Sequence, residues 1–220
     1  MPPTPLRLSF LGFNPFGGGY DGRGLIDAGA DRTFASLDTL GAMRLVRRHF
    51  GLGSRPKGGH ASVLRTIATG EAAFDLRITG YSFGGWSALQ LAHALAPFGR
   101  RLRVRIGLVD PVGTFRPARA WRVGLGKGVA PWWPVGGAAY ATRPPHVVWA
   151  ENVYETHGLV ARTNGGTGRR KPYPARWFAS GPVAGFDNRD VTAEVSTAAG
   201  HIEVLERYGQ AVAAATFAEA

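Results

Sequence analysis

One short run in this chain contains a serine with a glycine two residues before it and another two residues after it, namely Gly80-Tyr81-Ser82-Phe83-Gly84-Gly85. Residues 74–79, which precede it, alternate apolar and polar side chains as a strand does, and residues 86–96, which follow it, have the pattern of a mostly buried helix. A Gly-x-Ser-x-Gly sequence between a strand and a helix presents the serine on a sharp, strained turn, and its glycines avoid collisions with neighbouring backbone. We therefore predict that Ser82 is a nucleophile, and the leading hypothesis is a serine hydrolase.

A serine hydroxyl is a weak nucleophile at neutral pH, so the chain must also supply a histidine that takes its proton. In a strand–turn–helix arrangement of this kind, the order along the chain is serine, acid, histidine. His201 is favoured because it lies on a loop of small residues just before the last predicted helix, and His157, just past a predicted strand, is the alternative. The remaining histidines precede the serine, lie inside the helix that follows it, or lie at the start of a strand: His49, His60, His93 and His146.

The acid that orients the histidine is predicted to be Asp110, which ends the apolar run 106–109 and is the lone acid between residues 99 and 146. A carboxylate at the end of a buried strand is costly without a partner, and a histidine would be such a partner. An ordinary Asp-Pro turn is the competing interpretation. The alternative acids lie near the end of the next strand or in the loop before the last helix, where they could instead cap that loop: Glu151, Glu155, Asp187 and Asp190.

Acyl transfer also needs two backbone N–H groups that stabilise the developing oxyanion. One is predicted to belong to Phe83, the residue after the serine. The other is expected from the loop after the first strand, from Phe13 or, next, from Asn14. The glycines at 17–19 in the same loop suggest a phosphate loop, but the lysine followed by Ser or Thr of a nucleotide-binding loop is missing, which argues against that interpretation.

The composition limits the chain to a few classes of protein. At 220 residues it fits one well-buried core, so we expect a single domain over 1–220. The absence of cysteine excludes disulfides and cysteine-bound zinc or iron–sulfur centres, and no metal or other cofactor is predicted. No charged leader precedes the short apolar run near the N-terminus, and no apolar run reaches ~18 residues. We therefore expect a soluble, cytoplasmic protein, unless it is exported without a cleavable leader.

The charge is strongly positive and unevenly distributed. The formal net charge is +11, and of the 26 basic residues only three are lysine. Residues 99–146 hold nine of these basic residues and one acid, and residues 156–181 hold five and no acid. Such segments attract anionic substrates, membrane surfaces or nucleic acid. Because an arginine-rich composition also follows from a GC-rich genome, no specific nucleic-acid partner is expected from the charge alone.

Strand patterns and helix patterns alternate along most of the chain. Strands are predicted at 6–13, 74–79, 103–109 and 146–154, and helices at about 33–49, 60–74, 86–96 and 202–217. This alternation predicts an α/β fold with a mostly parallel sheet covered on both faces. Residues 114–145 lack a clear period, hold several aromatic residues, and carry five basic residues and no acid, so we expect an insertion that forms a cap over the site.

The motif at 80–85, the strand-ending Asp110-Pro111-Val112-Gly113 and the late Gly200-His201 together resemble the α/β-hydrolase superfamily of lipases, esterases and thioesterases. The resemblance spans nearly the whole chain. The Asp-x-Val-Gly segment is also similar to one in bacterial lipase-like hydrolases, including some phospholipase effectors of type VI secretion, which carry the acid of the triad there. The chain departs from the common superfamily pattern in one respect, because its acid follows the strand adjacent to that of the serine instead of one strand later.

The resemblance implies a three-layer sandwich with the triad Ser82, Asp110 and His201, and hydrolysis of a small-molecule or lipid carboxylic ester through an acyl-enzyme. The aromatic, acid-free insertion suits a lid that binds an anionic membrane surface, and a packed cap with buried tryptophans is an equal alternative. Two further functions stay open, namely a thioesterase and a non-catalytic member of the fold that binds protein or nucleic acid through its basic surface. The sequence gives no expectation for the oligomeric state.

Overall fold

A computed structural model of the chain describes residues 3–12, 21–34, 59–70, 72–112, 142–157 and 180–219. The strands of this part are β1 (Thr4–Phe10), β2 (Arg32–Phe34), β3 (Phe74–Tyr81), β4 (Leu102–Val109), β5 (Val147–Tyr154) and β6 (Asp187–Asp190). Its α-helices are α2 (Gly59–Thr69), α3 (Phe83–Ala94) and α5 (Gly200–Phe217), and its 3-10 helices are η1 (Ala96–Arg101) and η2 (Thr192–Glu194).

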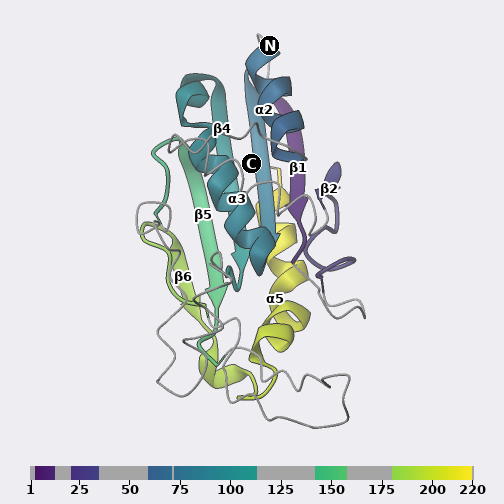
Figure 1. Cartoon of the computed structure of the whole chain (residues 1–220), viewed down its shortest axis with the longest axis vertical. Coiled ribbons are helices and arrows are strands. Elements are labelled where there is room, and N and C mark those ends of the chain that lie inside the picture. The colour runs from purple at the N-terminus through teal and green to yellow at the C-terminus, as the bar shows by residue number, and fades with distance from the viewer. Residues whose placement is uncertain are drawn as a thin grey trace, which may run out of the picture.

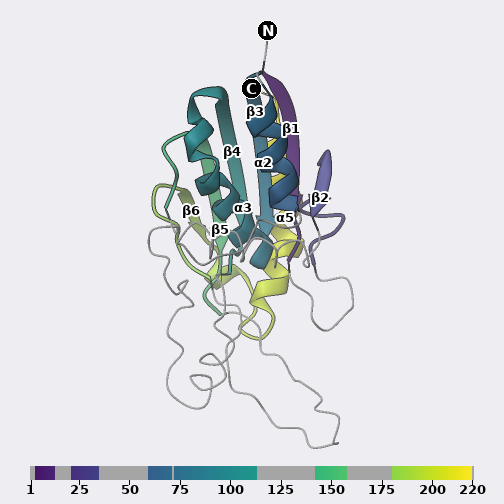
Figure 2. The ribbon, with the colours of Figure 1, turned by 45° about the horizontal axis from the view of Figure 1, so that its top comes forward.

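The strands form one sheet in the order β2-β1-β3-β4-β5-β6, and every neighbouring pair is parallel. Figures 1 and 2 show α2 and α3 on one face of this sheet and α5 on the other. The predicted α/β fold with a mostly parallel sheet is therefore confirmed. Because all strands run the same way, their carboxyl ends meet at a single edge, the lower edge in Figure 1, where binding sites of such sheets are built.

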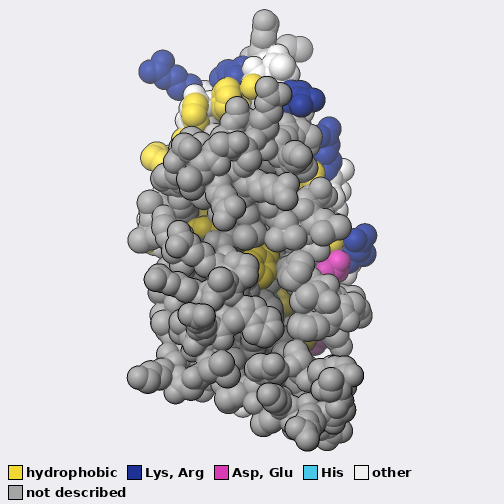
Figure 3. All heavy atoms as spheres, in the orientation of Figure 1, with side chains coloured by type: hydrophobic (Ala, Val, Ile, Leu, Met, Phe, Trp, Pro, Cys, Tyr) yellow, Lys and Arg dark blue, Asp and Glu magenta, His cyan; other side chains and the backbone are white. Residues whose placement is uncertain are grey.

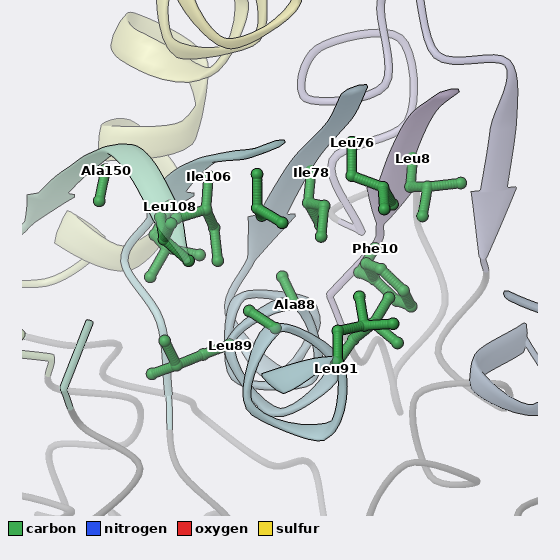
Figure 4. Close-up of a cluster of buried hydrophobic side chains, with 14 of the residues drawn as sticks. Leu8, Phe10, Leu76, Ile78, Ala88, Leu89, Leu91, Ile106, Leu108 and Ala150 are labelled. Carbon is green, nitrogen blue, oxygen red and sulfur yellow. The ribbon is translucent and has the colours of Figure 1, made fainter. Parts of the chain in front are cut away.

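Two apolar clusters hold the layers together. The larger one lies between the sheet and the helices α2 and α3, and Figure 4 shows side chains of four strands and of α3 pointing toward one another. The smaller one lies between the sheet and α5, where Tyr81, Val109 and Val153 pack with Val204 and Leu205. Both faces of the central strands are covered most completely toward the carboxyl edge, where β3 is buried from Leu76 to Tyr81 and β4 from Ile106 to Val109.

Helix α5 is anchored at its carboxyl end by arginines of the sheet. A terminal nitrogen of Arg77, in β3, donates to the carbonyl oxygens of Phe217 (2.6 Å) and Ala218 (2.8 Å). Arg105, in β4, donates to those of Ala215 (2.9 Å) and Ala218 (3.0 Å). Cations suit the unpaired carbonyls at a helix end. An 18-residue helix is about 27 Å long, so its first residues reach the carboxyl edge of the sheet.

The structure differs from the predicted elements at several boundaries. Residues 32–34 form the edge strand β2 where the helix predicted at 33–49 would begin, and residues 35–49 of that helix lie outside the described residues. Helix α2 ends at Thr69, five residues earlier than predicted, because β3 already begins at Phe74. Strand β6 was not predicted, since all four of its residues are exposed and polar. Of the predicted cap at 114–145, only 142–145 are described.

The basic residues of the described part of 99–146 lie at the edge of the sheet opposite to the carboxyl ends or within the first half of β4. Arg100 and Arg101 end η1, directly before β4, and Arg143 Nε donates to the carbonyl of Val147 (2.8 Å), the first residue of β5. Figure 3, in the orientation of Figure 1, shows Lys and Arg side chains gathered toward the upper end of this face and along one side. An eight-residue strand separates the two edges by about 26 Å. None of the helices described combines the length and the apolar character needed to cross a bilayer.

Candidate active site

Ser82 occupies a sharp turn between β3 and α3, at the carboxyl edge of the sheet. Its backbone has φ 54° and ψ −126°, a conformation that a residue with a side chain adopts only when its surroundings enforce it. Two hydrogen bonds to the neighbouring strand region supply that constraint: the Ser82 N–H donates to the carbonyl of Val109 (3.1 Å), and the Ser82 carbonyl accepts from the N–H of Val112 (3.0 Å). The strand–turn–helix context predicted from the motif is therefore present around this serine.

The glycines of the motif leave no room for side chains. A Cβ on Gly80 would lie 2.6 Å from the carbonyl oxygen of Gly84, and one on Gly84 would lie 1.9 Å from the carbonyl oxygen of Phe10. Both contacts are with backbone, which cannot move aside. Glycine at these positions lets α3 start directly beside β1 and β3, so the turn that carries Ser82 can be tight.

Asp110 is a second strained residue at the same edge, directly after β4. Its φ of 47° is left-handed, which aspartate tolerates better than most residues. Its N–H donates to the carbonyl of Val153 in β5 (2.7 Å), and its carboxyl group is completely buried. The non-glycine residues with positive φ in the described part of the chain are thus Ser82 and Asp110, which end adjacent strands. Backbone strain of this kind accumulates at functional sites.

His201 joins the two strained residues. It is the second residue of α5 and is 4% exposed. Its Nε2 lies 2.9 Å from the hydroxyl oxygen of Ser82, and its Nδ1 is hydrogen-bonded to Oδ2 of Asp110. The other carboxyl oxygen of Asp110 accepts the N–H of Glu155 (3.0 Å). With Nδ1–H donating to the carboxyl group, Nε2 carries the lone pair that can accept the serine proton.

Burial shifts the pKa values of His201 and Asp110. Desolvation lowers the pKa of His201 to about 4, so the imidazole is neutral at pH 7. Desolvation also keeps the pKa of Asp110 well above its usual value, and the hydrogen bond from the Glu155 N–H offsets only part of that shift. A neutral imidazole beside a hydrogen-bonded carboxyl group is the resting state of a general base.

The oxyanion side of the site is described in part. Phe83 is the first residue of α3, so its N–H belongs to the positive end of the helix. Gly12, in the loop after β1, passes close to the serine, since a Cβ on Gly12 would lie 3.1 Å from Cβ of Ser82. The loop that was expected to supply the second donor therefore starts beside Ser82. Phe13 and Asn14 themselves lie outside the described residues.

The alternative bases do not reach Ser82 among the contacts described. His93, in α3, has Nε2 2.9 Å from the carbonyl oxygen of Thr142, and His146 lies at the opposite edge of the sheet, just before β5. His157 donates its backbone N–H to the carboxyl group of Glu155. His60 is the second residue of α2, and His49 lies outside the described residues.

The alternative acids have other roles, with one exception. Glu151 lies within β5, where it is paired in register with Asp187 of β6, and burial raises its pKa. Asp190 accepts the N–H of Thr192 (2.9 Å) and so caps the turn that leads into η2. Glu155 is the exception, because it is fully buried and adjoins Asp110 and His201.

Asp110, Glu155 and His201 are also the only described group of side chains whose ligand-type atoms could together hold a metal ion, all lying within 4.8 Å of one another. Their oxygen and nitrogen atoms are already engaged with each other, since Nδ1 of His201 bonds to Asp110 and Nε2 lies beside Ser82. The hydrogen bonds therefore explain the grouping without an ion.

Tyr81 is a contact of the site that the sequence did not reveal. Its hydroxyl donates to the carbonyl oxygen of His201 (2.9 Å), and its ring stacks against the imidazole with centroids 4.9 Å apart. It is the variable residue between Gly80 and Ser82, so the motif carries no signal for it. It holds the first turn of α5 against the end of β3 and covers one face of the imidazole.

No protein-family model, curated protein or solved structure matches this chain. The functional assignment therefore depends on the sequence and geometry described above.

Proposed function

We propose that the protein is a serine hydrolase of the α/β-hydrolase type, which cleaves a carboxylic ester of a small molecule or lipid through an acyl-enzyme on Ser82. The observation that carries this proposal is the buried hydrogen-bonded chain from Ser82 through His201 to Asp110. Ser82 and Asp110, at the ends of two adjacent strands, both have strained backbone conformations, and such strain is typical of functional sites.

In the proposed reaction the Ser82 oxygen attacks the ester carbonyl carbon while Nε2 of His201 takes the hydroxyl proton. The resulting oxyanion is stabilised by the N–H of Phe83 at the start of α3 and by a second donor from the loop after β1. When the intermediate collapses, the C–O bond to the alcohol breaks and His201 gives its proton to the departing oxygen. Water then attacks the acyl-enzyme with His201 as base, which releases the carboxylic acid and restores Ser82.

The electrostatics of the site suit this sequence of proton transfers. His201 has a pKa of about 4, lowered by burial, so it is ready to accept a proton throughout the neutral range. The imidazolium that forms in the transition state lies beside the Asp110 carboxyl group in a site of low dielectric, where an opposite charge stabilises it strongly. Asp110 thus stabilises the transition state more than the resting state, and such a difference in stabilisation is what lowers the reaction barrier.

The proposal is tested by steady-state hydrolysis of p-nitrophenyl esters of increasing chain length and of an acyl thioester. Ser82→Ala should lower kcat/KM for the preferred substrate by about 10³-fold or more. Ser9→Ala is the matched control, because Ser9 is equally buried at the same end of the neighbouring strand β1 but donates only to the carbonyl of Ile26 (3.2 Å). If Ser82→Ala and Ser9→Ala hydrolyse these substrates equally well, Ser82 is not the nucleophile.

A further inference from the structure

Glu155, the first residue after β5, places a second buried carboxyl group in the candidate site. Its side chain is 0% exposed, and its backbone N–H donates to Oδ1 of Asp110 (3.0 Å). A carboxyl oxygen of Glu155 also lies within 4.8 Å of a carboxyl oxygen of Asp110. The catalytic scheme above assigns no role to this second acid.

The side chain of Glu155 also abuts the backbone that carries the base. Its Oε2 accepts the N–H of His157, and a Cβ on Gly200 would lie 2.7 Å from the same oxygen. Gly200 begins α5 and directly precedes His201. Glu155 therefore lies between the end of β5, the acid of the triad and the first turn of the helix that holds the imidazole.

Two buried carboxyl groups this close can form a hydrogen bond only if one of them holds a proton, because ionised carboxylates only accept. Asp110 uses one oxygen to accept the Glu155 N–H and the other to bond to the imidazole of His201. It is the member of the pair suited to be ionised. Two buried carboxylates at this separation would repel each other, so the remaining proton belongs on Glu155.

The other titratable groups that face Glu155 in the described part of the chain come from three elements. They are Asp110 after β4, His201 in α5, Tyr81 at the end of β3, and His157 two residues further along its own segment. Tyr81 and His201 are neutral at pH 7, because burial raises the pKa of the phenol and lowers that of the imidazole.

We infer that Glu155 is a positioning residue that remains protonated at neutral pH and donates a hydrogen bond to the Asp110 carboxylate, which it thereby holds toward His201. The positioning role rests on the proposed function, whereas the retained proton does not. Glutamine reproduces a protonated glutamate, since its amide donates toward Asp110 and its oxygen accepts from the His157 N–H.

The proton is tested by urea unfolding of the wild type and Glu155→Gln between pH 5 and pH 9. A folded state that keeps a proton released on unfolding, where glutamate has its ordinary pKa of about 4.3, loses stability as pH rises. The unfolding constant of the wild type relative to Glu155→Gln should therefore rise with pH, by up to tenfold per unit. Glu206→Gln, which removes an exposed carboxyl group from α5, is the control and should follow the wild type. A ratio that is flat or falls with pH overturns the inference.

The positioning role is tested by kinetics on the same proteins at pH 7.5. Glu155→Gln should keep kcat within a few-fold of the wild type, whereas Glu155→Ala should lower kcat on the order of 10- to 100-fold with little change in KM, because the acid and the base lose their alignment. Equal loss in both variants would mean that an ionised Glu155 is needed and would overturn the inference. If the wild type itself has no hydrolase activity, the proposed function fails, and the unfolding experiment still decides the protonation of Glu155.

Discussion

Replacing Asp110 with asparagine tests the direction of the hydrogen bonds in the site. One oxygen of the Asp110 carboxyl group accepts the N–H of Glu155 (3.0 Å), and the other bonds to Nδ1 of His201. Asparagine offers one oxygen and one NH2 group. If its oxygen keeps the bond to the Glu155 N–H, its NH2 group faces Nδ1, which must then become the acceptor.

The consequence for catalysis is large, because the imidazole proton moves to Nε2. That nitrogen lies 2.9 Å from the Ser82 oxygen and can no longer take its proton. Loss of the correct tautomer in a serine triad lowers kcat by about 10⁴-fold, which corresponds to about 5.5 kcal/mol of transition-state stabilisation. We expect a loss of 10³- to 10⁴-fold here, with the fold retained because asparagine has nearly the volume of aspartate.

The assay is kcat/KM for the preferred ester, with circular dichroism and urea unfolding as checks on the fold. Glu151→Gln is the matched control, since Glu151 is a partly buried acid on the neighbouring strand β5 and has no contact with His201 among those described. An Asp110→Asn protein with wild-type turnover, together with an inactive Glu151→Gln, would refute the assignment of the acid.

Three shorter predictions concern the turn, the base and the tyrosine. Gly84→Ala should lower the free energy of unfolding by about 1–3 kcal/mol or more and abolish most activity, because the new Cβ would lie 1.9 Å from the carbonyl oxygen of Phe10. The control is Gly181→Ala, where a Cβ meets nothing within 4 Å, and its stability in urea unfolding should equal that of the wild type. The pH profile of kcat/KM should be flat through the neutral range and fall below about pH 4, where His201 becomes protonated and cannot act as base, and a limb near pH 6.5 would contradict the burial of the imidazole. Tyr81→Phe should cost about 1 kcal/mol in urea unfolding through the lost bond to the His201 carbonyl but change kcat only a few-fold, and a loss above 10²-fold would give Tyr81 a role in the chemistry.

Much of the frame of the site could be predicted because it is encoded locally. The alternation before residue 80 and the apolar run after residue 85 predict β3 and α3, and these elements enclose Ser82 in the structure. The lone acid after an apolar run predicts Asp110 at a strand end, and the small-residue loop before the last helix predicts His201 near a helix start. The structure brings these three side chains together, and their catalytic roles remain predictions.

The sequence favours Asp110 but leaves Glu151 and Glu155 as alternatives, because the position of the acid depends on long-range contacts. His201 meets Asp110 across 91 residues and Ser82 across 119 residues. Which strand ends lie beside the serine is set by the strand order β3-β4-β5, and the order of strands in a parallel sheet is not encoded in any one of them. Glu155, one strand further away, therefore looked like a rival of Asp110 when it is in fact its neighbour.

Two elements were missed because they lack the expected pattern. Strand β6 is four exposed polar residues, which carry no hydrophobic signal and pair with β5. Strand β2 is three residues long and pairs with β1 at the edge of the sheet, where the local spacing of apolar residues suggested a helix. In both cases the neighbouring strand, and not the local sequence, determines the conformation.

The most direct test of the proposed function is covalent labelling with a fluorophosphonate, followed by mass spectrometry of the intact protein and of its peptides. The activated Ser82 oxygen should displace fluoride from the reagent and give one phosphonyl adduct per chain, located on the peptide that contains residues 80–85. Ser82→Ala and His201→Ala should remain unlabelled under conditions in which Ser9→Ala is fully labelled. A wild-type protein that gives no adduct, or an adduct that persists in Ser82→Ala, would contradict the assignment of Ser82 as the nucleophile.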